Sequence, residues 1–123
     1  MIHIQALPGT PRNKWSLPAI INKALSEAEI YKEHGVDGLV VENMHDIPYQ
    51  HTSKVGPEIT ACMAVICHHI KKFFKSGPVG VQILAGANQQ ALSVAKAAEL
   101  DFVRAEGFVF SHVADEGIPS SAT

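Results

Sequence analysis

The sequence predicts an α/β fold, the N-terminal half of a (β/α)8 barrel, formed by a single incomplete domain over residues 1–123. Three observations predict it. Short apolar segments alternate with amphipathic ones in the order β-α-β-α-β-α-β, which is typical of a parallel sheet with right-handed crossovers. Each predicted strand has one apolar face and one face that carries a polar or charged residue. The 123 residues are about half of the ~250 that a complete barrel needs.

A stiff loop separates the first predicted strand from the first predicted helix. Residues 1–7 are apolar and β-prone, and Pro8-Gly9-Thr10-Pro11 ends them, since this cluster continues neither a strand nor a helix. Residues 17–34 carry apolar residues at helical spacing, from Leu17 to Tyr31. Gly35 follows as the expected left-handed cap of this helix.

The second strand and helix are separated by a polar loop. Residues 37–42 predict a short buried strand, and residues 43–55 predict a loop rich in histidine and proline. Pro57 occupies the favoured first position of the next helix, with Glu58 in its first turn. The apolar stripe of that helix runs from Ile59 to Phe74, and Gly77-Pro78 ends it.

The last predicted elements are a strand, a helix and a short strand. Residues 79–84 form the third strand, and Asn88 is expected to cap the third helix. The apolar stripe of this helix includes Leu92 and three alanines, Ala91, Ala95 and Ala98. Residues 101–105 predict the fourth strand, and the chain from Gly107 onward is weakly patterned.

Strand alternation favours the barrel over a small open doubly wound sheet, the competing architecture. One face of the strands is wholly apolar and should pack against helices: Ile2, Ile4, Ala6, Leu39, Val41, Val79, Val81, Ile83, Val103 and Ala105. The other face carries His3, Gln5, Leu7, Gly38, Val40, Glu42, Gly80, Gln82, Leu84, Phe102, Arg104 and Glu106. An open doubly wound sheet has helices on both faces, which tend to be apolar. The polar second face indicates the interior of a barrel.

Composition excludes several classes of protein. The net charge of -2 and pI of about 6.4 give no electrostatic footprint for nucleic acid. No apolar run reaches the ~18–20 residues of a membrane span, and no signal peptide opens the chain. Cys62 and Cys67 are five apart in a predicted helix, so a disulfide between them is not expected. These features predict a cytoplasmic protein, or a mitochondrial one if a longer precursor exists.

Several of these segments resemble the BtpA family. The first is the opening strand and loop, Met1 to Pro11, and the second is Gly35-Val-Asp-Gly-Leu-Val-Val-Glu-Asn-Met44 with Asp46 and Pro48. Pro57-Glu58, Gly80-Val81 and Phe102-Val-Arg104 with Asp115 and Gly117 continue the similarity in order. The resemblance implies a (β/α)8 barrel like those of the ribulose-phosphate-binding group, and a role like photosystem I biogenesis. It also implies that the family continues for about as long again beyond this chain.

Barrel active sites lie at the C-terminal ends of the strands, where this sequence places polar residues. The candidates are His3, Gln5, Glu42, Asn43, Asp46, Gln82, Arg104 and Glu106. Glu42 or Asp46 would act as a general base, and His3 as an acid or polarising donor. Arg104 would hold an anionic, phosphorylated metabolite, with Gln5, Asn43, Gln82 and Glu106 as further substrate-binding residues. The structural alternative is an internal ion pair of Glu42 with Arg104 and a hydrogen-bonded core position for His3.

No metal and no cofactor is expected. His45, Asp46 and His51 share one loop and could join Glu42 as ligands, but their spacing matches no closed metal motif. The lysines fall in loops and helices, which disfavours a Schiff base on a strand.

Three hypotheses remain open at this point. The chain is an enzyme-derived barrel half that binds a small anion, a non-catalytic assembly or stability factor, or a truncated form without independent activity. Its expected partner is a second copy or a missing C-terminal half, because half a barrel leaves two strand edges unpaired.

Overall fold

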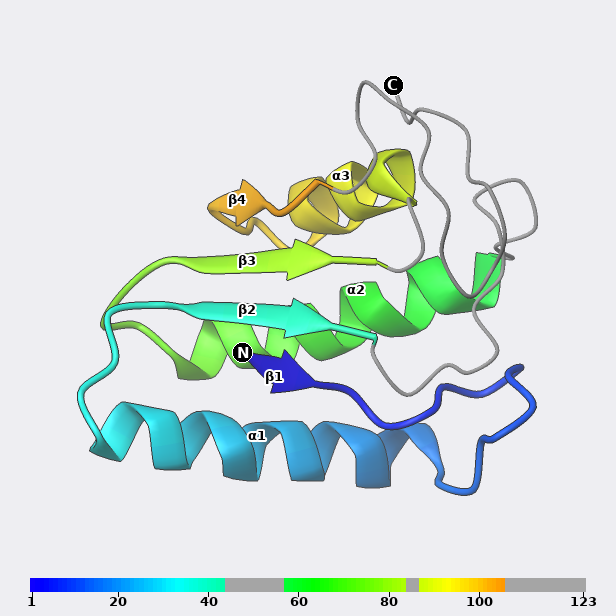
Figure 1. The fold of residues 1–123 in the computed structure, drawn as a ribbon, viewed down its shortest axis with the longest axis horizontal. Helices are drawn as coiled ribbons and strands as arrows, with labels where there is room; N and C mark the ends of the chain where they lie inside the picture. Colours follow the sequence, from blue (N-terminus) through cyan, green and yellow to red (C-terminus); the bar gives the residue numbers. More distant parts are fainter. Residues whose placement is uncertain (44–56, 84–86, 106–123) are drawn as a thin grey trace.

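In the described part of the chain, the fold consists of four parallel strands with three helices on one side. The computed structural model describes residues 1–43, 57–83 and 87–105. The elements are β1 (Ile2–His3), α1 (Leu17–Glu33), β2 (Leu39–Glu42), α2 (Pro57–Phe73), β3 (Val79–Gln82), α3 (Asn88–Ala97) and β4 (Phe102–Val103). The strands lie side by side in chain order, and every pair is parallel (Figure 1).

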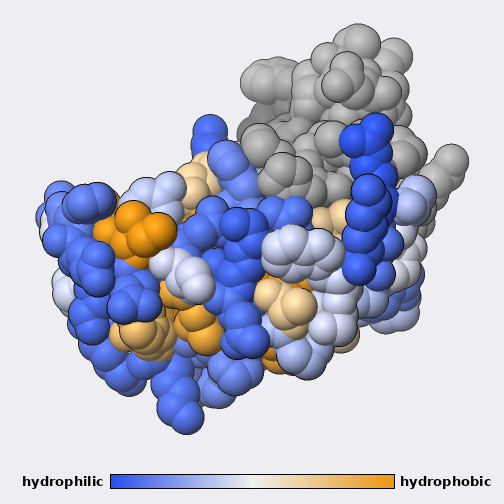
Figure 2. All heavy atoms as spheres, turned by 90° about the horizontal axis from the view of Figure 1, so that it is seen from below, coloured by the Kyte–Doolittle hydropathy of each residue, from blue (hydrophilic) through white to orange (hydrophobic). Residues whose placement is uncertain are grey.

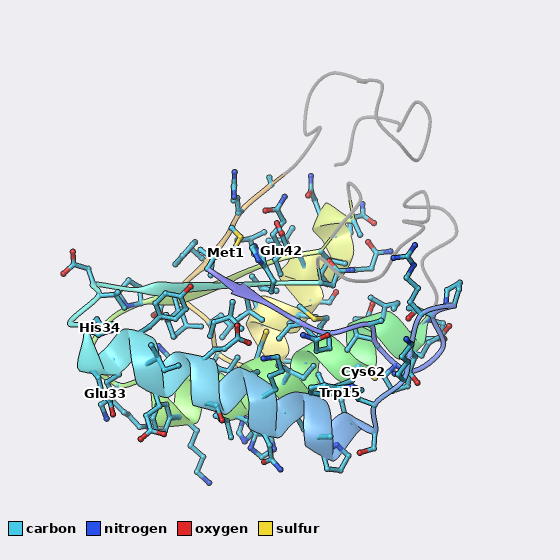
Figure 3. All side chains as sticks on the ribbon, turned by 60° about the horizontal axis from the view of Figure 1, so that its bottom comes forward. Met1, Trp15, Glu33, His34, Glu42 and Cys62 are labelled. Carbon is cyan, nitrogen blue, oxygen red and sulfur yellow. The ribbon has the colours of Figure 1, made fainter. Side chains whose placement is uncertain are left out.

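This arrangement is that of half a (β/α)8 barrel. A doubly wound sheet reverses its strand order at a switch point and has helices on both faces. Here the order β1-β2-β3-β4 does not reverse, and α1, α2 and α3 all lie on the same side of the sheet (Figure 3). The predicted α/β half-barrel is therefore confirmed.

The helix ends follow from the local sequence. Ser16 precedes α1, and its side-chain oxygen accepts a hydrogen bond from the amide of Ala19 at 3.4 Å. Gly35 has φ +71°, a left-handed conformation in which its amide donates to the carbonyl of Lys32 at 3.1 Å. The predicted cap of the first helix is confirmed. α2 begins at Pro57, as expected.

Four details differ from the sequence-based expectation. Asn88 does not cap α3, because it is the first helical residue and Ala87 holds the capping position without a side-chain hydrogen bond. Leu92, expected in the buried stripe, is 56% exposed. Leu7, which alternation places on the polar face, is fully buried in the hydrophobic core, whereas Ala105, which alternation places on the helix-facing side, is exposed. The strands are also shorter than predicted, since β1 and β4 hold two residues each.

The core lies between the sheet and the helix layer. The apolar strand face supplies Ile2, Ile4, Leu39, Val41, Val79, Val81 and Ile83, and the helices supply Ile20, Ala24, Met63, Ile66, Ile70, Ala91 and Val94 among others. Burying a large apolar side chain stabilises a fold by about 1.5–3 kcal/mol. Alternation along the strands thus decides which face of the sheet is covered.

Hydrogen bonds of two polar side chains connect the N-terminal ends of strands to the adjacent helices and strands. The hydroxyl of Tyr31 donates to the carbonyl of Met1 at 3.0 Å. The carboxylate of Asp101 accepts from Lys71 Nζ at 2.7 Å and from the amide of Val79 at 2.8 Å. These two donors hold the pKa of Asp101 below its usual value.

The outer surface in the view of Figure 2 is mainly hydrophilic, with small separate hydrophobic areas. Among the helices that the structure describes, none has the length and apolar character that crossing a membrane requires.

Candidate functional site

The strand register brings four of the predicted site residues into one row across the sheet. His3 is paired with Glu42 between β1 and β2, and Glu42 with Gln82 between β2 and β3. The amide of Arg104 donates to the carbonyl of Val81 at 3.0 Å, which extends the β3–β4 ladder by one residue and places Arg104 next to Gln82. Neighbouring strands lie about 4.8 Å apart, so the side chains of this row are within reach of one another.

Glu42 is the buried centre of this row. Its side chain is only 5% exposed, and its Oε1 accepts no hydrogen bond from the described part of the chain. His3 Nε2 lies 3.7 Å from Oε1, a separation that is too long for a hydrogen bond but close enough for an ion pair when the imidazole is protonated. In Figure 3, Glu42 and Met1 lie on the side of the sheet away from α1.

The imidazole of His3 lies between the buried carboxylate and solvent. Its side chain is 39% exposed, so it is accessible from outside while it stays close to Glu42. A carboxylate with one free oxygen and a histidine beside it is an arrangement that can accept and return a proton. This pair is the chemical centre of the candidate site.

The remaining described candidates surround the pair. Asn43 and Gln82 are buried, Gln5 is half-buried and Arg104 is exposed. Asn43 and Gln82 each make a polar or electrostatic interaction within the fold. The other candidates, Asp46 and Glu106, lie outside the described residues, as do His45, His51 and Asp115.

The structural alternative, an internal ion pair between Glu42 and Arg104, is wrong. Within the described parts of the chain, the ion pairs are His3–Glu42 and Lys71–Asp101. Glu42 is one strand away from His3 but two strands away from Arg104, so the nearer residue takes the contact. The guanidinium of Arg104 is therefore not neutralised by Glu42.

Sequence reasoning missed an aromatic contact next to this row. Gly80 and Phe102 are paired between β3 and β4, two positions before Gln82 and Arg104. A Cβ atom at Gly80 would overlap the ring of Phe102, so the ring lies over the glycine on the same face as the polar row. A glycine paired with an aromatic residue on a neighbouring strand is the signal that could have indicated it.

Other reactive groups lie away from the row. Burial raises the pKa of the Cys67 thiol to about 12, which removes it as a nucleophile near neutral pH. A hollow of about 310 Å³ is lined by His68, Lys71, Lys72, Lys75 and the end of α3. Lys71 and Lys72 lie in the last turn of α2, where they complement the helix dipole. The described residues contain no group of three or more His, Cys, Asp or Glu side chains that could hold a metal ion.

Comparison with known proteins places this arrangement in a family. The model of the BtpA family matches residues 1–122. The chain belongs to the BtpA family. It is 50% identical over 121 residues to an uncharacterised mitochondrial protein of Caenorhabditis elegans, covering 95% of this chain and 43% of that protein.

Two further BtpA-family relatives show how widely the sequence is distributed. An uncharacterised protein of Archaeoglobus fulgidus is 37% identical, and the match covers 96% of this chain and 46% of that protein. The photosystem I biogenesis protein BtpA of Synechocystis is 29% identical, and the match covers 96% of this chain and 40% of that protein. The chain thus spans less than half the length of these curated relatives. No solved structure matches it.

Proposed function

We propose that this chain supplies one half of an acid–base site in a BtpA-family barrel, and that the site binds a small anionic, phosphorylated metabolite. The observation that carries the proposal is the buried Glu42 carboxylate: among the described residues none donates a hydrogen bond to its Oε1, and His3 Nε2 lies 3.7 Å from it. Leaving a buried acceptor unsatisfied costs about 1–3 kcal/mol, which a fold tolerates where the group has a task.

Each residue of the row has a role in this proposal. Glu42 accepts a proton from the substrate, and His3 donates a proton to the substrate or polarises the substrate group on which charge develops. Arg104 holds the anionic group, because a guanidinium presents several donors in one plane. Gln82, between Glu42 and Arg104, orients the bound molecule, and Gln5 and Asn43 line the site. Asp46 and Glu106 keep their proposed roles as a second base and a further binding residue.

A second candidate function is that of a non-catalytic assembly or stability factor. It is favoured by the name of the Synechocystis relative, a photosystem I biogenesis protein. The two functions differ in what they require of the row. If Glu42→Gln and Arg104→Gln leave the biological activity of the protein intact, the assembly role is supported and acid–base chemistry is not. A form without independent activity is the third possibility, and such a chain would bind no ligand.

Localisation is proposed on the same basis. The nematode relative is named as mitochondrial, which supports the mitochondrial alternative for this chain over the cytoplasmic one.

The proposal is tested by following the backbone amide resonances of the chain by NMR during titration with inorganic phosphate and with a phosphorylated pentose. The amides of Gln82 and Arg104 are expected to shift, with binding in the millimolar range because only half of the site is present. Arg104→Gln should weaken binding about tenfold, which corresponds to ~1.4 kcal/mol. Arg12→Gln is the matched control, because Arg12 is an exposed loop residue of the same charge.

Two results of this titration would contradict the proposal. Equal weakening in both variants would indicate attraction by net charge alone and would refute the role of Arg104. No shift with either probe would refute binding of a phosphorylated metabolite by this half of the barrel.

A further inference from the structure

The face of the sheet opposite the helices is not covered by any described helix or strand. Alternation along the strands places Met1, Val40 and Phe102 on it, beside the polar row. Met1 is 36% exposed and Phe102 is 39% exposed. An apolar face next to buried polar groups is typical of a surface that another protein element covers.

Both edges of the sheet also have amides that point away from it. The amide of Ile4 donates to the carbonyl of Glu42 on β2, and the amide of Arg104 donates to the carbonyl of Val81 on β3. Successive amides along a strand point to opposite sides. The amides directed outward at the two edges are therefore those of His3, Gln5, Val103 and Ala105.

We propose that a second copy of this chain covers the open face and closes an eight-stranded barrel with it. Four strands from each copy give the eight of a (β/α)8 barrel. A twofold axis along the barrel keeps all strands parallel, so β4 of each copy pairs with β1 of the other. Closed twofold dimers are the commonest oligomers of soluble proteins.

Charge is compatible with this self-association. The open face of one copy carries the Glu42 carboxylate and the Arg104 guanidinium, which do not pair with each other. In the closed dimer, two Glu42 carboxylates and two Arg104 guanidiniums lie inside the same barrel, so the opposite charges balance there.

The helix layer supports the same arrangement. α1 and α3 flank α2, and each exposes a large apolar side chain, Ile30 at 55% and Leu92 at 56%. Closure places α3 of one copy beside α1 of the other, which offers these side chains a partner.

Light scattering after size exclusion, over a wide range of protein concentration, tests the proposal. The expected mass is about 26 kDa, twice the 13.2 kDa of one chain. Phe102→Lys should weaken the dimer about a hundredfold or more, because it places an ammonium group inside the closed barrel. Val65→Lys is the matched control, since Val65 is 41% exposed on the central helix α2 and stays outside the barrel. A monomer at every concentration, open-ended aggregates or a dimer insensitive to Phe102→Lys would overturn the proposal.

If circular dichroism shows that the Phe102→Lys variant does not fold, amide hydrogen exchange on the unsubstituted chain tests the dimer instead. The outward amides of Val103 and Ala105 on one edge, and of His3 and Gln5 on the other, should exchange slowly and become faster on dilution. Fast exchange at both edges in a dimer would show that the copies associate elsewhere. Both measurements need no ligand, so their failure is distinguishable from failure of the proposed function.

Discussion

Replacement of Glu42 by methionine should stabilise the fold, because it removes a buried carboxylate that the structure does not satisfy. The unpaired Oε1 costs about 1–3 kcal/mol. The lost contact with His3 offsets part of this, but an ion pair at 3.7 Å whose histidine is 39% exposed contributes only about 0–1 kcal/mol. Methionine has a similar length and no charge. The net expectation is a gain of roughly 1–2 kcal/mol in the free energy of unfolding.

Urea unfolding followed by circular dichroism at pH 7 measures this change. The free energy of unfolding falls by about 1–3 kcal/mol per molar of urea, so the urea midpoint should rise by roughly 0.3–2 M. Protein concentration is held constant, because self-association shifts apparent stability. Glu29→Met is the control, since Glu29 is an exposed glutamate on α1 and its substitution should stay within about 0.5 kcal/mol.

The opposite result would refute the reasoning. A loss of more than about 1 kcal/mol in Glu42→Met, with Glu29→Met unchanged, would mean that the carboxylate anchors the fold. Glu42 would then be a structural residue, and the acid–base proposal would lose its central observation.

Three further predictions follow from the described contacts. Gly80→Ala should lower the free energy of unfolding by about 1–3 kcal/mol in the same urea assay, because the added methyl overlaps the Phe102 ring; an added Phe102→Ala should recover part of the loss. Asp101→Asn should destabilise the chain at pH 7. The pKa of Asp101 is lowered by the hydrogen bond from Lys71, so this difference should shrink as the pH falls below the ordinary value of 3.8 and vanish below the folded-state pKa; a constant difference from pH 7 to pH 2 would contradict it. Cys67 should resist iodoacetamide at pH 8 in the folded chain and react in urea, because a pKa of about 12 leaves a thiolate fraction on the order of 10⁻⁴; rapid labelling of the folded chain would contradict its burial.

Local signals predicted the helices well. The helix at Leu17 begins where the apolar spacing indicates, and the helix at Pro57 begins at its proline. Gly35 has the left-handed conformation that its place after a helix predicts. These features depend on residues within one or two turns of each other, so the sequence alone contains their physical cause.

Local signals did worse where long-range contacts decide the outcome. Whether Leu92 is buried depends on a neighbouring helix, and no described helix covers it. Leu7 lies beyond the end of β1, so strand alternation no longer determines its direction and packing buries it. Asn88 is a good capping residue by type, but α3 begins at Asn88 itself, so the capping position belongs to Ala87.

The same division holds for the candidate site. The sequence by itself determined which residues stand on the polar face of the strands, because side chains alternate with a period of two. Only the tertiary structure decided that His3, Glu42, Gln82 and Arg104 form one row, and that Glu42 contacts His3 rather than Arg104. Register between parallel strands is set by how the crossover helices pack on the other face of the sheet. Residues separated by 39 positions along the chain, such as His3 and Glu42, therefore meet only once that packing is complete.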